Sequence, residues 1–193
     1  MVNPPPSDVP AGRYEPGVLG RTLLSESDIE TRVAALAARI TADYAGTSPL
    51  LVGVLRGAFI FMADLSRAID LPIQVDFMAV SSYGNATSSS GVVRILKDLD
   101  EDLTGRHVIV VEDIIDSGLT LSYLRRNLNN RGAASVEVCA LLVREGRQKV
   151  DEDLKYVGFE IPADFVIGYG LDVSGRYRNL PFIAEYVGGG AHR

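Results

Sequence analysis

Two carboxylates and a run of small polar residues lie in the middle of the chain. Residues 108–112 are Val-Ile-Val-Val-Glu, and such an apolar run is typical of a buried strand. Glu112 and Asp113 form a pair that could hydrogen-bond vicinal hydroxyls or hold a hydrated Mg²⁺. Because consecutive side chains of a strand point to opposite faces, the pair can serve one ligand only if the strand ends at about Asp113. By themselves, two acidic residues indicate no more than a solvated strand end.

The residues that follow this pair favour a binding site. Residues 116–120 are Asp-Ser-Gly-Leu-Thr, so a tight turn with two hydroxyls is expected to lead into a helix. The backbone N–H groups of such a turn and a helix N-terminus together bind phosphate. Asp116 alone could be only a helix cap. The turn would donate hydrogen bonds to a phosphate, and the nearby carboxylates would accept them from vicinal hydroxyls. Together they predict a sugar phosphate as the ligand.

Three other kinds of site are disfavoured by residue spacing. The chain contains no Walker-type phosphate loop, and its glycines beyond residue 167 are not at dinucleotide-binding spacing. His107 and His192 are not at metal-ligand spacing with each other or with Cys139, which argues against a zinc site. Cys139 lies within an apolar run, so we predict that it is a core residue.

Strands and helices are expected to alternate along the chain. A helix is predicted from Ser27, which has capping-box spacing with Glu30, to about Gly46, and further helices at 58–69 and 120–131. Strands are predicted at 50–55, 73–80, 92–96, 108–112 and 136–143, with shorter ones near 156–157, 165–167 and 182–186. This order predicts an α/β fold with an open, mostly parallel, twisted sheet and helices on both faces. Ligands of such folds bind beyond the carboxyl ends of the strands, where residues 112–120 would lie.

The chain is expected to form one domain. Its 193 residues fit a single core, which we expect to span residues 21–187. Residues 1–20 are rich in proline and glycine and predict a mobile arm, and residues 188–193 predict a frayed tail. Residues 81–91 are nearly all small and polar, which predicts a lid or a binding loop at the tip of a long hairpin.

The composition argues against several classes of function. The formal net charge is -6, which opposes a broad nucleic-acid surface and a polybasic membrane anchor. No apolar run approaches the length of a membrane span, and the first residues lack the pattern of a signal peptide. With one cysteine, the chain can form no internal disulfide. We therefore expect a cytoplasmic protein with small-molecule partners, no nucleic acid and no membrane.

Several segments resemble those of one enzyme family, and they occur in the same order. Residues 110–120 resemble the phosphoribosyl-pyrophosphate (PRPP) motif of type I phosphoribosyltransferases, and most of all that of the hypoxanthine-guanine branch. Residues 55–57, Leu-Arg-Gly, are similar to the pyrophosphate loop of that family. The stretch from Ser81 to Asp100 is similar to its flexible catalytic loop. Residues 165–172 and Arg178 are similar to its base and pyrophosphate segment.

The resemblance covers residues 20–187 and has consequences for the whole protein. It implies the type I phosphoribosyltransferase fold, in which the terminal segments add a small hood to the sheet. It implies PRPP and a 6-oxopurine, hypoxanthine or guanine, as substrates, Mg²⁺ as cofactor, and a homodimer or homotetramer. The implied reaction is purine salvage, which yields IMP or GMP and pyrophosphate.

The resemblance also implies roles at the sugar phosphate. Glu112 and Asp113 would hold the ribose hydroxyls, directly or through Mg²⁺. Asp116 would sit near N7 of the purine as the general base. Residues 55–57 would bind pyrophosphate, with a cis peptide between Leu55 and Arg56. The loop around the 5′-phosphate would consist of Ile115, Asp116, Ser117, Gly118, Leu119 and Thr120.

Five residues are implied at the purine: Ile114, Arg144, Phe165, Val166 and Asp172. Phe165 would stack on the base, and the Val166 backbone would read its edge. Ile114 and Arg144 would also contact the base, and Arg144 would face its 6-oxo group. By pattern alone, Phe165 could equally be a core residue.

The remaining implied roles concern the leaving group and the exclusion of water. Asp172, at the base end, would support a second Mg²⁺, and Arg178 would bind pyrophosphate. By residue type alone, Arg178 could equally be a solvated charge. Ser82 and Tyr83 would be the inner contacts of a loop that closes over the reacting ribose.

Three positions depart from the pattern of the hypoxanthine-guanine branch. Arg56 and Arg144 stand where lysine is usual, and Val173 stands where an aromatic residue is common. Arginine keeps the charge but donates as a planar fork, so the replacement is not neutral. Arg144 therefore leaves open a relative specialised for a modified purine or another acceptor. A PRPP-sensing regulator that binds RNA is a third hypothesis, which the acidic net charge disfavours.

Overall fold

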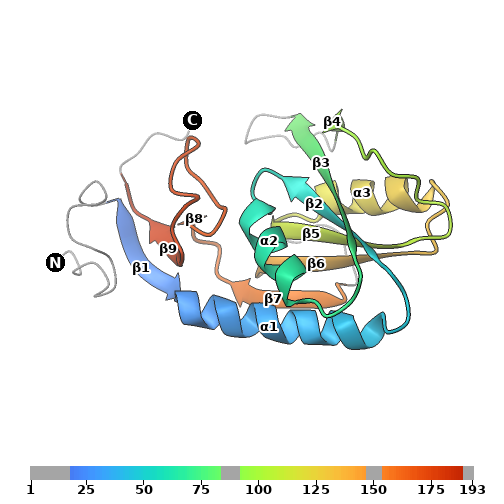
Figure 1. Cartoon of the computed structure of the whole chain (residues 1–193). Coiled ribbons are helices and arrows are strands. Elements are labelled where there is room, and N and C mark those ends of the chain that lie inside the picture. Colours follow the sequence, from blue (N-terminus) through green and yellow to red (C-terminus); the bar gives the residue numbers. More distant parts are fainter. Residues whose placement is uncertain (1–17, 84–91, 147–153, 189–193) are drawn as a thin grey trace.

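The computed structural model describes residues 18–83, 92–146 and 154–188, and its larger sheet has six strands (Figure 1). The strands are β2 (Leu50–Leu55), β3 (Gln74–Tyr83), β4 (Val92–Lys97), β5 (His107–Ile115), β6 (Ser135–Arg144) and β7 (Tyr156–Ile161). Their order is β4-β3-β2-β5-β6-β7. All neighbours pair in parallel except β3 and β4, which form an antiparallel hairpin at one edge. The predicted open, mostly parallel sheet is confirmed.

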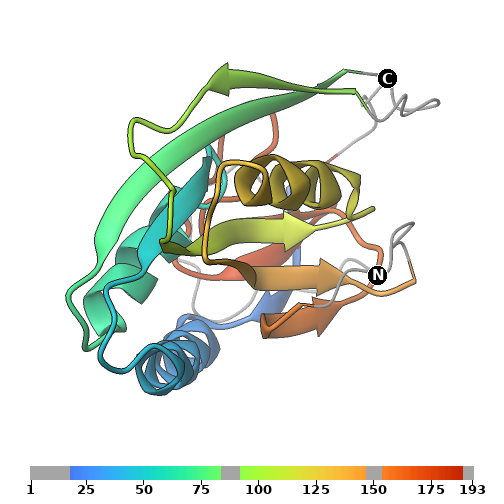
Figure 2. The ribbon, with the colours of Figure 1, turned by 90° about the vertical axis from the view of Figure 1, so that its right-hand side faces the viewer.

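Helices cover both faces of this sheet, as predicted. α1 (Glu26–Asp43) and α2 (Phe59–Ala68) lie on one face, and α3 (Leu119–Asn129) lies on the other (Figure 2). Ile109 of β5 packs in the core with α1 and α2, whereas its neighbour Val110 packs in the core with α3. Since β5 is buried on both faces, its sequence is a continuous apolar run rather than an alternation.

A second, three-stranded sheet forms the predicted hood. It consists of β1 (Leu19–Leu24), β9 (Ile183–Tyr186) and β8 (Val166–Ile167), in that order and antiparallel. It lies beyond one end of the larger sheet (Figure 1). Its own small core contains Val18, Ile167, Val173, Leu180, Phe182 and Ala184. The hood thus joins segments from both ends of the described chain.

The start of the described chain differs from the prediction in two respects. Leu19 and Gly20, which we expected in the mobile arm, belong to β1. The capping box of α1 is formed by Ser25 and Asp28, not by Ser27. Ser25 Oγ accepts from the Asp28 N–H at 3.2 Å, and the Asp28 carboxylate accepts from the Ser25 N–H at 3.0 Å. Aspartate replaces the usual Glu or Gln three residues after the cap, so spacing alone indicated the wrong serine.

Several expectations fall on residues that are not described. The β3–β4 hairpin confirms the predicted return of the chain, but its tip, residues 84–91, lies outside the described ranges, as do residues 1–17 and 189–193. The lid, the arm and the tail therefore stay predictions. Within the described ranges, no helix is long and apolar enough to cross a membrane.

Candidate active site

The turn between β5 and α3 surrounds a small cavity at the carboxyl end of the sheet. Gly118, the N-cap of α3, has a φ of 76°, a left-handed conformation that glycine adopts without a steric penalty. The Leu119 N–H donates to Ser117 Oγ at 3.4 Å. The cavity measures about 130 Å³ and is lined by Glu112, Ile114, Ile115, Asp116, Ser117, Gly118, Thr120 and Leu121. A turn that leads into a helix N-terminus in this way can hold a phosphate group.

Glu112 is a buried carboxylate in the wall of this cavity. Its exposed fraction is 8%. Burial raises the pKa of Glu112 well above its usual value, and the negative charge of Asp113 raises it further. A buried carboxylate favours a ligand that brings positive charge or hydrogen-bond donors.

Asp113 points to the other face of β5. The strand continues to Ile115, so the expectation that it ends at about Asp113 is wrong, and adjacent side chains alternate between the faces. A Cβ added to Gly57 would lie 1.5 Å from Asp113 Oδ2, so the carboxylate fills the space beside Gly57. Burial raises the pKa of Asp113, whereas a backbone hydrogen bond from Ile114 and the charge of Arg178 lower it.

The loop of residues 55–57 joins β2 to α2 beside Asp113. Its Leu55–Arg56 peptide is cis, as the resemblance implied. Gly57 also contacts the C-terminal part of the chain, because a Cβ added to Gly170 would lie 2.1 Å from the Gly57 carbonyl oxygen. Because neither glycine has a side chain, Gly57 can pack against the Asp113 carboxylate, and Gly170 can pack against the Gly57 backbone.

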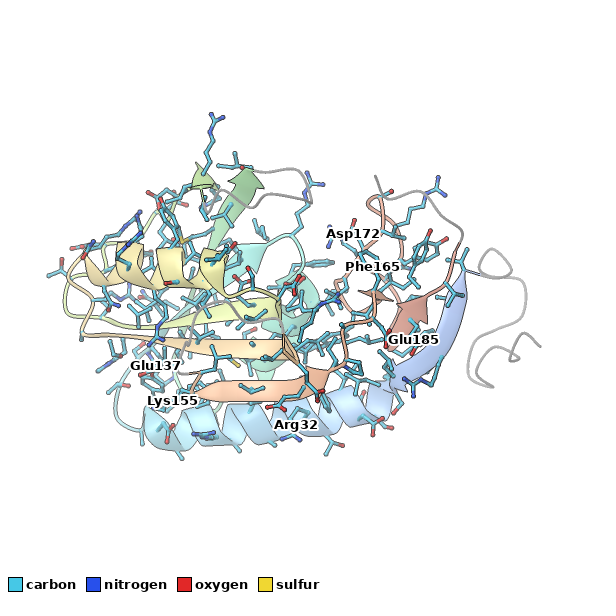
Figure 3. The ribbon with its side chains drawn as sticks, turned by 180° about the vertical axis from the view of Figure 1, so that it is seen from behind. Arg32, Glu137, Lys155, Phe165, Asp172 and Glu185 are labelled. Carbon is cyan, nitrogen blue, oxygen red and sulfur yellow. The ribbon has the colours of Figure 1, made fainter. Side chains whose placement is uncertain are left out.

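Arg178 is held by the residues that precede it. Its guanidinium donates to Asp172 Oδ1 at 2.6 Å and to the Gly170 carbonyl oxygen at 2.5 Å. The second Asp172 oxygen accepts from the Gly175 N–H at 2.6 Å. Asp172 and Phe165 both extend from the part of the chain that runs through the hood (Figure 3). The structure thus brings Arg178 and Asp172 to the Gly57 side of the site, because Gly170 touches both Arg178 and Gly57.

Arg144, at the end of β6, lies beside the segment that leads to Phe165. Its Nη1 donates to the carbonyl oxygens of Ala163 and Asp164, at 2.7 and 2.8 Å. Phe165 is 47% exposed and makes an edge contact with Tyr186, with ring centroids 5.8 Å apart. The implied stacking residue is therefore not a core residue.

The other implied site residues are placed as follows. Asp116 is exposed at the cavity, and Ile114 is half-buried in its wall. Val166 is buried in β8. Ser82 and Tyr83 end β3, but their side chains lie outside what the structure describes. Proximity of these two residues to the site therefore stays a prediction.

Sequence reasoning also missed a contact between α2 and the segment that runs through the hood. The Tyr169 hydroxyl donates to Asp64 Oδ2 of α2 at 2.7 Å, across 105 positions of the sequence. Neither residue type nor spacing indicates a contact over that separation. The sequence does contain one clue, because glycines flank Tyr169 at positions 168 and 170. In the structure both glycines have positive φ, so the backbone around Tyr169 is unusual.

Comparisons with known proteins agree with this geometry. A family model described as a phosphoribosyl transferase domain matches residues 21–174. The chain is 53% identical over 180 residues to a hypoxanthine-guanine phosphoribosyltransferase of Mycobacterium avium, covering 90% of this chain and 88% of that protein. It is 52% identical over 163 residues to the corresponding protein of Bacillus subtilis, covering 84% and 91%. A crystal structure of a hypoxanthine-guanine phosphoribosyltransferase from Bacillus anthracis matches with a TM-score of 0.85 and 46% identity, over 88% of this chain and 99% of that one.

Fold, sequence and site geometry therefore agree on one class of protein. The chain belongs to the phosphoribosyltransferase family. It is an enzyme, a pentosyltransferase, and its similarity lies with the hypoxanthine-guanine branch, as residues 110–120 predicted.

Proposed function

We propose that this enzyme transfers the 5-phosphoribosyl group of PRPP to hypoxanthine or guanine in the cytoplasm, releasing pyrophosphate and forming IMP or GMP. One observation carries the proposal. The β5–α3 turn combines a loop cavity, the buried Glu112 and the exposed Asp116 in a single place. The relatives are named hypoxanthine-guanine phosphoribosyltransferases, and these names support the same reaction.

The charges at the site suit cleavage of the bond between ribose C1′ and pyrophosphate. This cleavage builds positive charge on the ribose and negative charge on the leaving group. Arg178, fixed by Asp172 and by the Gly170 carbonyl, would neutralise the leaving group. The 55–57 loop would bind the pyrophosphate oxygens, and the turn at 116–120 would hold the 5′-phosphate.

The incoming purine would lie between Asp116 and Phe165. Asp116 is exposed, so its carboxylate could approach N7 and accept the proton that the base loses. The half-exposed ring of Phe165 would stack on the purine. The Val166 backbone would read the edge of the base, and Ile114 would contact it from the cavity wall.

Mg²⁺ fits the donor groups at this end of the sheet. Among the described residues, no three His, Cys, Asp or Glu side chains form a complete metal site. Mg²⁺ commonly takes one or two carboxylates and completes its octahedron with water and substrate phosphates. Because Glu112 and Asp113 lie on opposite faces of β5, each would supply a ligand on its own side of the strand, and Asp172 would support a second ion. When bound, Mg²⁺ would neutralise negative charge on the pyrophosphate group.

A direct assay tests the reaction. Purified protein with Mg²⁺ and PRPP should release pyrophosphate on addition of hypoxanthine or guanine, and the nucleotide product should appear in equal amount. Absence of product with hypoxanthine, guanine and xanthine would contradict the proposal. A heat-denatured sample and a reaction without purine are the controls.

Arg144 favours a second candidate, an enzyme specialised for a modified purine or another acceptor. Its Nη1 donates to the carbonyl oxygens of Ala163 and Asp164, so the guanidinium is held against the segment that leads to Phe165. A panel of purines separates the two candidates. If Arg144→Lys gained activity with hypoxanthine or guanine, this would support the specialised enzyme. High activity of the unaltered enzyme with both bases would contradict that candidate.

We further propose that the enzyme is a homodimer or homotetramer, as its family membership suggests. Sedimentation equilibrium of the purified protein measures this directly. A monomer at concentrations that support full activity would contradict it.

A further inference from the structure

Tyr169 has an unusual backbone conformation beside the proposed pyrophosphate site. Its φ is 48°, and the φ values of the flanking Gly168 and Gly170 are 102° and 98°. A left-handed conformation is uncommon for a residue with a large side chain, and it persists where several contacts determine it. Here the Tyr169 N–H donates to the Leu180 carbonyl oxygen at 2.9 Å, and the residue is buried. The side chain makes a further contact.

The hydroxyl of Tyr169 is anchored on α2. It donates to Asp64 Oδ2 at 2.7 Å, and the other Asp64 oxygen accepts from Arg67 at 2.5 Å. Burial, with the hydrogen bond to Asp64, raises the pKa of Tyr169, so the hydroxyl remains a donor at neutral pH. α2 begins at Phe59, directly after the loop that contains Gly57. The hydrogen bond therefore connects the helix that follows the 55–57 loop to the hood segment.

The position of Tyr169 determines where Gly170 lies. The Gly170 N–H donates to the Arg178 carbonyl oxygen at 2.9 Å, and the Gly170 carbonyl oxygen accepts from the Arg178 guanidinium. On its other side, Gly170 packs on the Gly57 carbonyl oxygen so closely that a Cβ has no room. Gly170 thus touches both groups that the proposed function assigns to pyrophosphate.

We propose that Asp64 and Tyr169 are positioning residues for the pyrophosphate group. Their hydrogen bond ties α2 to residues 168–172 and so fixes the separation between Arg178 and the 55–57 loop. They act through Gly170 and not by contact with substrate. This inference deepens the proposed function and rests on it.

Tyr169→Phe tests the inference, because it removes the hydroxyl and keeps the ring. We expect the KM for PRPP and the Kd for pyrophosphate with Mg²⁺ to rise roughly three- to tenfold, the effect of one hydrogen bond, while kcat and the KM for the purine change by less than about twofold. A general loss of packing would instead lower the amount of active enzyme without this selectivity.

Substitutions at Asp64 and Arg67 of α2 complete the test. Asp64→Asn keeps an acceptor for the Tyr169 hydroxyl and should preserve the KM for PRPP, whereas Asp64→Ala should match Tyr169→Phe. The double variant Tyr169→Phe/Asp64→Ala should be no worse than either single variant, because both remove one hydrogen bond. Arg67→Gln is the matched control, since it breaks only the exposed ion pair on the same carboxylate.

The inference fails if Tyr169→Phe leaves the KM for PRPP unchanged, if it raises the KM for the purine equally, or if the two single effects add. Should Tyr169→Phe not fold, the comparison of Asp64→Asn with Asp64→Ala decides alone. Calorimetric binding of pyrophosphate with Mg²⁺ separates this inference from the proposed function. Weaker binding in Tyr169→Phe would support positioning even if the unaltered protein used none of the purines tested, and equal binding would contradict it.

Discussion

At the scale of single residues, the site depends on how two adjacent carboxylates are divided between the faces of β5. Glu112 faces the β5–α3 cavity, and Asp113 fills the space beside Gly57. Residue types alone indicated both positions, and the turn that follows them, as candidates. They could not reveal that Asp113 touches Gly57, because this contact depends on the parallel pairing of β2 with β5.

Asp116→Asn tests the proposed general base. The amide has the same size but cannot accept a proton at neutral pH, so we expect kcat to fall by roughly 10²- to 10⁴-fold with little change in the KM for PRPP. Steady-state kinetics with both substrates varied measures this. Asp164→Asn, an exposed carboxylate outside the cavity, is the control. An unchanged kcat in Asp116→Asn would remove the general-base role.

Gly57→Ala tests the close contact with Asp113. A methyl group 1.5 Å from Asp113 Oδ2 must displace the carboxylate or the loop, so we expect kcat/KM for PRPP to fall and the melting temperature to drop. Overpacking of this kind costs about 1–3 kcal/mol. Removing the obstructing carboxylate in Gly57→Ala/Asp113→Ala should recover part of the melting temperature without recovering activity. Additive losses in the double variant would show that the two residues do not compete for space.

At the scale of elements, the strands and helices around the proposed site were predictable, whereas β1 and the exact start of α1 were not. β5 and α3 show clear apolar patterns because both are packed into large cores. β1, by contrast, is only partly buried along its length, so Leu19–Leu24 lacks a distinct strand pattern. The start of α1 was misplaced because Ser25 and Ser27 are both good caps, and only the position of Asp28 decides between them.

Ser25→Ala and Ser27→Ala form a matched pair that tests this start. Loss of the Ser25 hydroxyl leaves the Asp28 N–H without its cap, and we expect the free energy of unfolding to fall by about 1 kcal/mol. Ser27→Ala removes an exposed hydroxyl in the first turn and should change stability by less than about 0.5 kcal/mol. Urea denaturation followed by circular dichroism gives both values. A larger loss of stability in Ser27→Ala than in Ser25→Ala would instead support Ser27 as the N-cap of α1.

The other end of α1 predicts a dependence of stability on pH. Asp43 accepts from the Tyr156 hydroxyl at 2.7 Å and pairs with Lys155 at 3.2 Å, and these contacts lower the pKa of Asp43. A lowered pKa in the folded state gives stability that is present above the unfolded value of 3.8 and is lost as the pH falls through the folded value. Melting curves should therefore show a gap between the unaltered protein and Asp43→Asn at pH 7 that closes in acid. A gap that is constant with pH would contradict this assignment.

At the scale of the whole molecule, the proposed substrates would span two sheets. The turn at 116–120 belongs to the larger sheet, whereas Phe165, Asp172 and Arg178 belong to the segment that forms the hood. The alternation of strands and helices predicted the larger sheet. The contact of Gly57 with Gly170 could not be predicted, because it joins residues that only the finished packing brings together.

This division predicts how the molecule responds to its ligands. In the free protein, amides of β1 and β9 should exchange with deuterium faster than those of β5 and β6, because the hood has a small core of its own. Nucleotide product or PRPP with Mg²⁺ should slow exchange in the hood, since the ligand would bridge both sheets. Mass spectrometry of peptides from each strand measures this. Equal protection in all four strands, with and without ligand, would contradict it.

The pairing of β1 with β9 also has a consequence during protein synthesis. Leu19 pairs with Tyr186, so the first described strand leaves the ribosome long before its partner is translated. α1 and the strands of the larger sheet can fold as they emerge, because all neighbouring strands of this sheet except β2 and β5 also follow one another in the chain. A nascent chain whose residues 183–186 are still in the exit tunnel therefore has a nearly complete larger sheet and an unpaired β1. We expect that such a chain binds the proposed purine only after β9 has emerged and has paired with β1.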